Sequence, residues 1–180
     1  MNYNNKVCSF TGYRPKKLYE AFSDENGMAE LSEKLRIEIS GLISDDYTVF
    51  QCGMALGADM LFAGIVAEFK RRYPGVKLIA VVPCHGQESS WSEKQQHKYK
   101  QLLNEASEVK IVSNSAYFDG CMQIRNRELV ETCDLLLAVY DGKRGGTMQT
   151  VEYAKKLGRR IRIIDPSTML RVSLFQQGRL

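Results

Sequence analysis

The sequence predicts an α/β protein with one doubly wound domain, built on a mostly parallel sheet of about six strands. Short apolar runs alternate with segments whose apolar residues recur at helical spacing, through most of the chain. This alternation is typical of a parallel sheet covered by helices on both faces. The sequence contains no internal repeat or linker-like segment. We therefore expect a single domain over residues 1–180, with its core between about 6 and 165.

Six segments are predicted to be strands from their length and apolar content. They are Lys6–Phe10, Tyr47–Cys52, Lys77–Val82, Val109–Val112, Leu135–Tyr140 and Arg160–Asp165. Pro83 and Pro166 end two of them, since proline cannot donate a ladder hydrogen bond. After Ser167 the chain has no clear period, and we expect its last few residues to be poorly ordered.

The segments between the strands carry helical periodicity. We expect a connection from Thr11 to about Asn26 before the first helix. Helices are then expected at about residues 28–42, 61–69, 93–106, 122–133 and 147–157.

The composition is ordinary for a soluble globular chain, with 44% hydrophobic and 26% charged residues. The net charge of +4 is too small to indicate nucleic acid as a partner, but it suits an anionic ligand. Met1–Lys6 is polar and leads straight into the first strand, so we expect no signal peptide. No apolar stretch is long enough to span a bilayer. We therefore expect a cytoplasmic protein with no membrane partner.

The five cysteines are odd in number and show no C-x-x-C spacing. Cys8, Cys52 and Cys133 lie in or beside apolar segments and are expected to be small buried hydrophobes. Cys84 and Cys121 fall in predicted loops at the edge where the strands end. Neither the cysteines nor the two histidines have the spacing of metal ligands, so the sequence predicts no metal and no cofactor.

The candidate binding site is organised around residues 138–158, where a strand, a glycine-rich turn and a helix follow one another. The first N–H groups of a helix lack intrahelical partners and carry the positive end of its dipole. Gly145 and Gly146 let these N–H groups approach a phosphate, and Thr147 can cap the helix or donate its hydroxyl. The alternative is an ordinary tight turn with a good N-cap.

Residues after the first two strands suit the same ligand, because ligands bind outside the carboxyl ends of the strands in doubly wound sheets. Arg14 is a fixed cation suited to phosphate. Asp59 either lines the cleft or only favours the helix N-terminus, and the glycines near it are also explained by close helix–strand packing. The candidates at these two strand ends are Thr11, Gly12, Arg14, Gly53, Gly57 and Asp59.

Arg125 lies on the apolar stripe of its predicted helix, three residues after Met122 and four before Leu129. Burying an unpaired arginine is costly, so Arg125 either pairs inside the protein or points into a ligand cleft. Its place in the first turn of the helix, near the strand ends, favours the cleft. Asn126 is adjacent to the same face and is a candidate with it.

Several common motifs are absent. The sequence has no G-x-x-x-x-G-K-[ST], no G-x-G-x-x-G and no G-x-S-x-G, so it indicates neither a P-loop NTPase, nor a standard dinucleotide fold, nor a serine hydrolase. His85, in the loop after the third strand, is interpreted as a solvated residue, with catalysis as the alternative.

With these residues in place, the chain resembles the SLOG superfamily, a Rossmann-like group that joins the LOG phosphoribohydrolases to the DNA-processing protein DprA. Its small YpsA-like branch is the most similar part. The resemblance covers about residues 6–165 and rests on Phe10–Pro15, Gly53–Asp59, Arg125–Asn126 and Gly145–Thr147 with its helix. It implies a Rossmann-like fold and a nucleotide phosphate at the glycine turn. Since such relatives are often dimers or larger, it also implies a homo-oligomer.

LOG enzymes carry P-G-G-x-G-T-x-x-E, in which the glutamate acts at the ribose together with an upstream helix arginine. Arg125 resembles that arginine and is a catalytic candidate on that ground. The position of the glutamate is Thr150 here, and Glu152 is turned far from it on a helix of 3.6 residues per turn. That carboxylate would stabilise positive charge developing at the ribose. LOG-type hydrolysis would therefore need Glu152 or Glu88 in its place.

The sequence thus predicts a sensor that binds a nucleotide, a nucleoside phosphate or an ADP-ribose derivative. Phosphate would be held by Arg14, Arg125 and the turn at 145–147. Asp59 or Asp141 would accept hydrogen bonds from ribose hydroxyls. Two alternatives stay open: a LOG-like enzyme that releases the base from a nucleoside monophosphate, and a DprA-like binder of single-stranded DNA. DNA binding would need a basic groove with stacking aromatics, and the sequence shows no clear stripe of that kind, so we do not expect nucleic acid as a partner.

Overall fold

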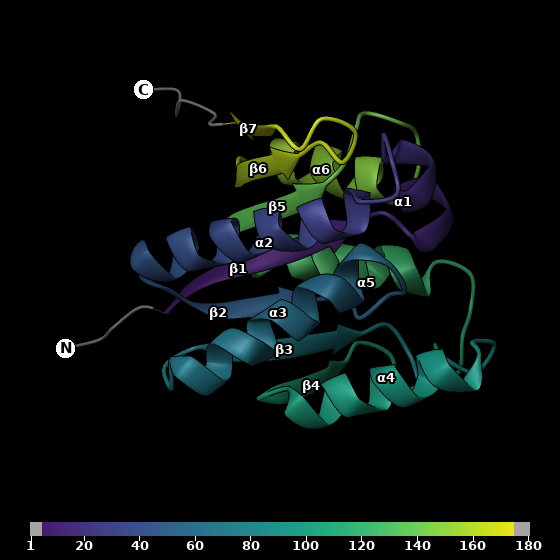
Figure 1. Ribbon diagram of the computed structural model, residues 1–180. Coiled ribbons are helices and arrows are strands. Elements are labelled where there is room, and N and C mark those ends of the chain that lie inside the picture. Colours follow the sequence, from purple (N-terminus) through teal and green to yellow (C-terminus); the bar gives the residue numbers. More distant parts are fainter. Residues whose placement is uncertain (1–4, 175–180) are drawn as a thin grey trace.

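Seven strands form one sheet in the computed structural model, which describes residues 5–174 (Figure 1). The strands are β1 (Lys6–Gly12), β2 (Tyr47–Cys52), β3 (Lys77–Val82), β4 (Glu108–Ile111), β5 (Leu135–Val139), β6 (Arg160–Ile164) and β7 (Arg171–Leu174). Their order across the sheet is β4-β3-β2-β1-β5-β6-β7. All neighbouring pairs are parallel except β6 and β7, which are antiparallel at one edge.

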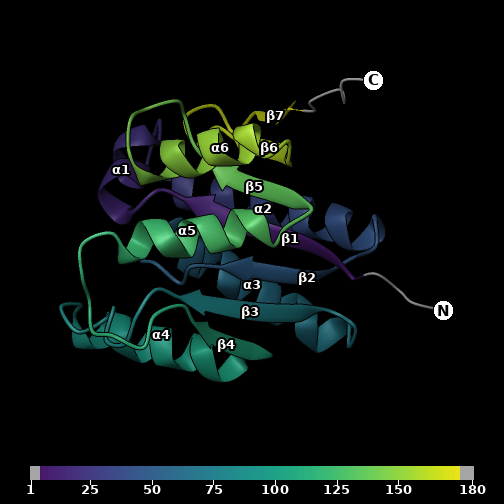
Figure 2. The same ribbon diagram turned by 180° about the vertical axis from the view of Figure 1, so that it is seen from behind.

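Helices cover both faces of this sheet. They are α1 (Pro15–Ala21), α2 (Gly27–Ser44), α3 (Ala58–Arg72), α4 (Glu93–Glu105), α5 (Cys121–Glu131) and α6 (Gly146–Lys156). α2, α3 and α4 lie on one side (Figure 1), and α5 and α6 lie on the other (Figure 2). None of the helices within residues 5–174 is both long enough and apolar enough to cross a membrane.

The two covered faces explain why the central strand β5 is apolar and buried at every position. In β1, Cys8 and Phe10 point into the core under α2 and α3, where the rings of Phe10 and Phe62 stack with centroids 4.3 Å apart. In β5, Leu136 and Ala138 belong to a second, smaller core formed with α5 and α6. Side chains on both faces of the central strands therefore lose contact with water, which favours apolar residues there.

The strand order reverses beside β1. From β1 the chain moves outward through β2 and β3 to β4, and it then returns to place β5 on the other side of β1. The connection after β1 leads to α2 on one face, and the connection after β5 leads to α6 on the other (Figures 1 and 2). In doubly wound sheets this divergence leaves a cleft at the carboxyl ends of the two strands.

The predicted fold class is confirmed, with two elements that the sequence analysis did not predict. α1 begins at Pro15, inside the connection predicted to precede the first helix. It buries Leu18 and Ala21. β7 lies in the segment after Ser167 that was interpreted as a tail, so the sheet has seven strands instead of about six. The last residues, expected to be poorly ordered, lie at 175–180, outside the described part of the chain.

Candidate functional site

A cleft of about 350 Å³ opens where β1 and β5 end. The predicted site residues that line it are Thr11, Gly12, Arg14, Asp59, Arg125, Asn126, Gly146 and Thr147. Residues that sequence reasoning missed also line it: Tyr13, Lys16, Lys17, Ala55 and Met122. The two lysines were missed because α1 was not predicted, although adjacent lysines after Pro15 at a strand end were a usable signal.

Three helices begin at this edge of the sheet. α3, α5 and α6 each contribute residues of their first or second turn to the wall of the cleft. The N-cap of α6 is Gly145, which has no side chain to accept a hydrogen bond, so Thr147 does not act as the cap. The first N–H groups of α6 therefore present the positive end of the helix dipole beside Gly146 and Thr147.

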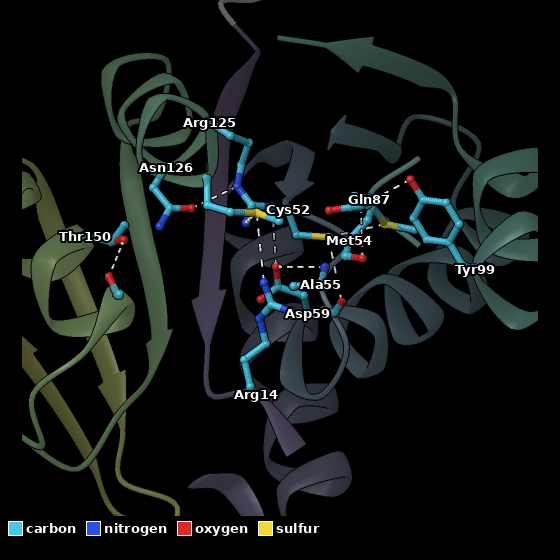
Figure 3. Close-up of polar contacts among 12 residues, drawn as sticks. Arg14, Cys52, Met54, Ala55, Asp59, Gln87, Tyr99, Arg125, Asn126 and Thr150 are labelled. Atoms are coloured by element: carbon cyan, nitrogen blue, oxygen red, sulfur yellow. Dashed lines mark hydrogen bonds and ion pairs between the residues drawn. The ribbon is translucent and has the colours of Figure 1, made fainter. Parts of the chain in front are cut away.

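Arg125 and Asp59 form a buried ion pair at the floor of the cleft (Figure 3). Nη1 of Arg125 is 3.9 Å from Oδ2 of Asp59, and the two side chains are only 5% and 6% exposed. Nε of Arg125 donates to Oδ1 of Asn126 at 2.8 Å, and Oδ2 of Asp59 accepts from the N–H of Ala55 at 3.3 Å. Arg125 therefore pairs inside the protein and also lines the cleft.

The hydrogen bonding of this ion pair is incomplete. Nη1 of Arg125 is buried and has no hydrogen-bond partner within residues 5–174. An unpaired buried donor costs about 1–3 kcal/mol, and more when it is charged. Burial also opposes both charges, since it lowers the pKa of Arg125 and raises the pKa of Asp59. Each partner offsets part of that cost for the other.

Arg14 and Arg125 converge on the sulfur of Met122. Nη2 of Arg14 is 3.9 Å from this Sδ atom, and Nη2 of Arg125 is 3.8 Å from it. Figure 3 shows the two guanidinium groups approaching each other from β1's loop and from α5. A thioether sulfur is a weak acceptor, so two cations share one weak, neutral partner at the wall of the cleft.

Gly53 and Gly57 serve packing, which the sequence analysis had kept as the alternative to ligand binding. A Cβ at Gly53 would lie 1.2 Å from Nη1 of Arg125, so this glycine makes room for the guanidinium against the backbone. Gly57 has φ +98°, and a Cβ there would lie 2.5 Å from the carbonyl oxygen of Tyr13. That carbonyl accepts a hydrogen bond from the N–H of Ala58 at 3.1 Å. Neither glycine is among the residues that line the cleft.

Lys17 lies close to Gly145, the residue that precedes α6. Gly145 has φ +154°, and a Cβ there would lie 2.6 Å from Nζ of Lys17. Lys17 also donates to the carbonyl oxygen of Arg144, so α1 is tied to the turn before α6. The ammonium group of Lys17 therefore lies beside the N-terminus of α6.

Asp141 is not among the residues that line the cleft, but its carboxylate binds Tyr13, which is. Its Oδ1 accepts from the hydroxyl of Tyr13 and, at 3.1 Å, from the N–H of Lys143, whose Nζ is 2.7 Å from Oδ2. Partial burial acts to raise the pKa of Asp141, but the hydrogen bonds from Lys143 and Tyr13 outweigh it, and the pKa lies below its usual value. The carboxylate ties the end of β1 to the turn after β5.

A second hollow, of about 420 Å³, lies between α5 and α6. Asn126 lines both this groove and the cleft. Glu152 lines the groove, where its Oε1 is 2.7 Å from Nζ of Lys155. Thr150, at the position of the LOG glutamate, is buried and donates its hydroxyl to the carbonyl oxygen of Gly146 at 2.9 Å. The structure therefore places Glu152 outside the cleft and on the adjoining groove.

The site chemistry comes from cations and backbone N–H groups. Among residues 5–174, no three His, Cys, Asp or Glu side chains gather in positions that could hold a metal ion. His85 is exposed on the loop after β3, and neither it nor Glu88 is among the residues that line the cleft.

Sequence comparisons identify relatives over most of the chain. The profile of the YspA SLOG family matches residues 8–169. A UPF0398 protein of Bacillus pumilus is 30% identical over 143 residues, which cover 79% of this chain and 77% of that protein. A UPF0398 protein of Bacillus thuringiensis is 30% identical over 155 residues, which cover 85% and 84% of the two chains.

Two solved structures have a similar fold. DNA processing protein A (DprA) of Streptococcus pneumoniae superposes with a TM-score of 0.62 at 17% identity, and the match covers 89% of this chain and 50% of that one. DprA of Helicobacter pylori, whose structure describes a single-stranded DNA binding mode, gives a TM-score of 0.58 at 14% identity, with 88% and 64% coverage. The chain thus spans about half to two thirds of the length of these DprA structures.

Proposed function

Because this chain belongs to the YspA SLOG family, we propose that it binds a nucleotide, a nucleoside phosphate or an ADP-ribose derivative in the cleft between the ends of β1 and β5. The protein would act as a ligand sensor, in which binding of the ligand changes the interaction with a partner. We further propose that residues 1–180 act as one domain in the cytoplasm, in a homo-oligomer of the kind that the SLOG resemblance implies.

The buried guanidinium of Arg125 carries this proposal. It lies at the floor of an open cleft, and its Nη1 lacks a partner within the described residues. Nη1 faces Asp59 and the backbone of Gly53, whereas Nη2 has only the weak sulfur acceptor of Met122, which a phosphate oxygen would replace. Arg14 would reach the same phosphate, since both guanidinium groups now share the sulfur of Met122. A purely structural buried arginine is expected to have its donors satisfied.

The charge around the cleft supports an anionic ligand. Four cationic side chains line the cleft, whereas Asp59 is the one carboxylate among the lining residues and already faces Arg125. The first N–H groups of α6 add partial positive charge beside Gly146. This balance suits a phosphate group with a charge of about −2 and would accommodate a second phosphate.

The sugar and base would extend from the cleft into the groove between α5 and α6. The two hollows meet at Asn126, and their volumes of about 350 and 420 Å³ lie in the usual range for small-molecule sites. Met148 and Tyr153 offer apolar surface to a base, and the side-chain amide of Gln149 can bond its polar edge.

Thermal unfolding against a panel of nucleotides and ADP-ribose derivatives tests the proposal. A ligand at about 100 times its Kd adds about 2.7 kcal/mol to the free energy of unfolding. For a chain of this size, the midpoint should rise by roughly 5–10 °C. We expect such a rise with at least one compound of the panel. No rise with any compound at millimolar concentration would contradict the proposal.

Variants assign the rise to the cleft. Arg14→Ala removes an exposed cation without disturbing the core, and it should abolish most of the rise. Arg125→Lys keeps the charge opposite Asp59 but cannot bind two phosphate oxygens, so it should do the same. Lys100→Ala, an exposed cation on α4, is the matched control and should keep the full rise.

A LOG-like hydrolase is a second candidate, because Glu152 lines the groove where the sugar would lie. Base release from nucleoside monophosphates, followed by chromatography, tests it. Turnover that is lost in Glu152→Gln would support the enzyme, and no turnover with any monophosphate would exclude it.

Single-stranded DNA is a third candidate, favoured by the fold shared with DprA and by the DNA binding that the Helicobacter pylori structure describes. The lysines of α1 give the cleft more cations than the sequence analysis expected. Binding of a labelled oligonucleotide that weakens steeply with salt would support this candidate, and a flat titration would exclude it.

A further inference from the structure

Cys84 and Cys121 face each other at the end of the sheet that carries the cleft. Their Sγ atoms are 3.9 Å apart, and the two residues are only 0% and 1% exposed. Cys84 follows β3, and Cys121 is the first residue of α5, which the sequence analysis had placed in a loop. Nothing in the proposed binding site uses these thiols.

The backbone holds the two segments side by side. The N–H of Ser113 donates to the carbonyl oxygen of Pro83 at 3.1 Å, and the N–H of His85 donates to that of Ser115 at 3.3 Å. These bonds join the loop after β3 to the segment that leads into α5 (Figure 2). The residues on either side of Cys84 are therefore bonded to the segment that precedes Cys121.

We propose that Cys84 and Cys121 are an oxidation site that forms a reversible disulfide with a peroxide. One thiolate attacks an oxygen of hydrogen peroxide, the O–O bond breaks, and a sulfenic acid and one water result. The other thiol sulfur then displaces the sulfenic oxygen as a second water, and the S–S bond forms. Two electrons pass from the two thiols to the peroxide, and the two thiol protons leave in the water molecules.

The two sulfur atoms are close enough for a disulfide to form after a small movement. A disulfide needs an S–S distance of about 2.05 Å, so the sulfur atoms must approach by rotation of the side chains and a small backbone shift. Residues 114–119, just before α5, are all exposed, so the core does not hold their side chains in place. Burial raises the pKa of Cys84, so little thiolate is present at neutral pH and the reaction is slower than at an exposed thiol.

The disulfide would fix the start of α5 against the end of β3. Met122 and Arg125 lie within the first five residues of α5 and line the cleft. Oxidation would therefore change how the cleft presents its guanidinium groups. This consequence rests on the proposed function, whereas formation of the disulfide does not.

Peptide mapping of the full chain after oxidation tests the proposal. Reduced protein is treated with a slight excess of hydrogen peroxide, its remaining thiols are alkylated, and its peptides are identified by mass spectrometry. We expect a linked Cys84–Cys121 peptide pair and the loss of two of the five free thiols. A cross-link over this separation should also raise the unfolding midpoint by about 8–15 °C, and dithiothreitol should reverse the rise.

Matched variants sharpen the result. Cys84→Ser and Cys121→Ser should each lose both the linked pair and the rise, and Cys133→Ala should keep both. If one serine variant does not fold, the other provides the same test. The peptide map of the oxidised wild type does not depend on either variant. Absence of the linked pair from folded, peroxide-treated wild type would overturn the proposal, as would a rise that persists in both serine variants. None of these readouts requires a ligand, so failure of the nucleotide proposal would leave them unaffected.

Discussion

Gly53 leaves the space that Arg125 occupies. Gly53→Ala would place a Cβ 1.2 Å from Nη1, so the guanidinium would have to leave its place opposite Asp59. Breaking a buried ion pair costs about 3–5 kcal/mol, and we expect the free energy of unfolding in urea to fall by about that amount. Gly64→Ala is the control, since a Cβ there meets no atom within 4 Å and a helical alanine adds up to about 1 kcal/mol. Equal stability of Gly53→Ala and wild type would contradict the described geometry.

Asp141 links stability to pH. Its pKa is lower in the native state than in the unfolded chain, so its contribution is present above about pH 3.8 and is lost as the pH falls through the native pKa. Asp141→Asn weakens the bonds to Tyr13 and Lys143, which should cost about 1–3 kcal/mol at neutral pH. Urea unfolding at a series of pH values should show the difference from wild type shrinking toward pH 2. A difference that is constant across this range would argue against the assignment.

Single residues differ in how far the sequence could predict them. Arg125 could be found because an arginine on an apolar stripe is a conflict visible within one helix. The role of Gly53 could not, because the side chain that fills its space comes from a helix far along the chain. The contact between Asp141 and Tyr13 could not be predicted either, because Tyr13 follows β1 and Asp141 follows β5.

At the scale of elements, the start of α6 is the predicted phosphate site. Gly146 is exposed, and a Cβ there meets no atom within 4 Å, so Gly146→Ala should leave the unfolding midpoint near that of wild type. The added methyl group would stand where a phosphate approaches the N–H groups, and we expect the Kd of the ligand to rise at least about tenfold, or 1.4 kcal/mol. Isothermal titration measures it. Unchanged affinity would place the phosphate elsewhere in the cleft.

The elements that the sequence predicted well are those buried on two faces. β2 and β3 have the predicted bounds, because β2 begins after two aspartates and ends before Gly53, and β3 ends before Pro83. The sequence did not predict α1 and β7, because each is short and half exposed and therefore lacks a full period of apolar residues. β7 pairs with β6, and Arg171 also forms an ion pair with the buried Glu38 on α2, contacts that no local pattern reveals.

At the scale of the whole molecule, salt dependence separates the ligand classes. A single strand that covers several phosphates releases counterions, so its affinity falls with a slope of about −0.7 per phosphate contact in a plot of log K against log salt. A mononucleotide in the cleft makes few such contacts and should give a shallow slope. We expect the shallow slope, measured by titration at 50 to 200 mM salt. Steep dependence with tight oligonucleotide binding would favour the DNA candidate.

The most direct test of the binding site follows individual amides during a titration. In a ¹⁵N-labelled sample, the nucleotide with the largest effect on the unfolding midpoint should shift the backbone signals of Gly146 and Thr147 and the side-chain Nε–H signal of Arg125. Shifts confined to other elements, such as α4 and β4, with these three signals unchanged, would contradict a phosphate at the cleft between β1 and β5.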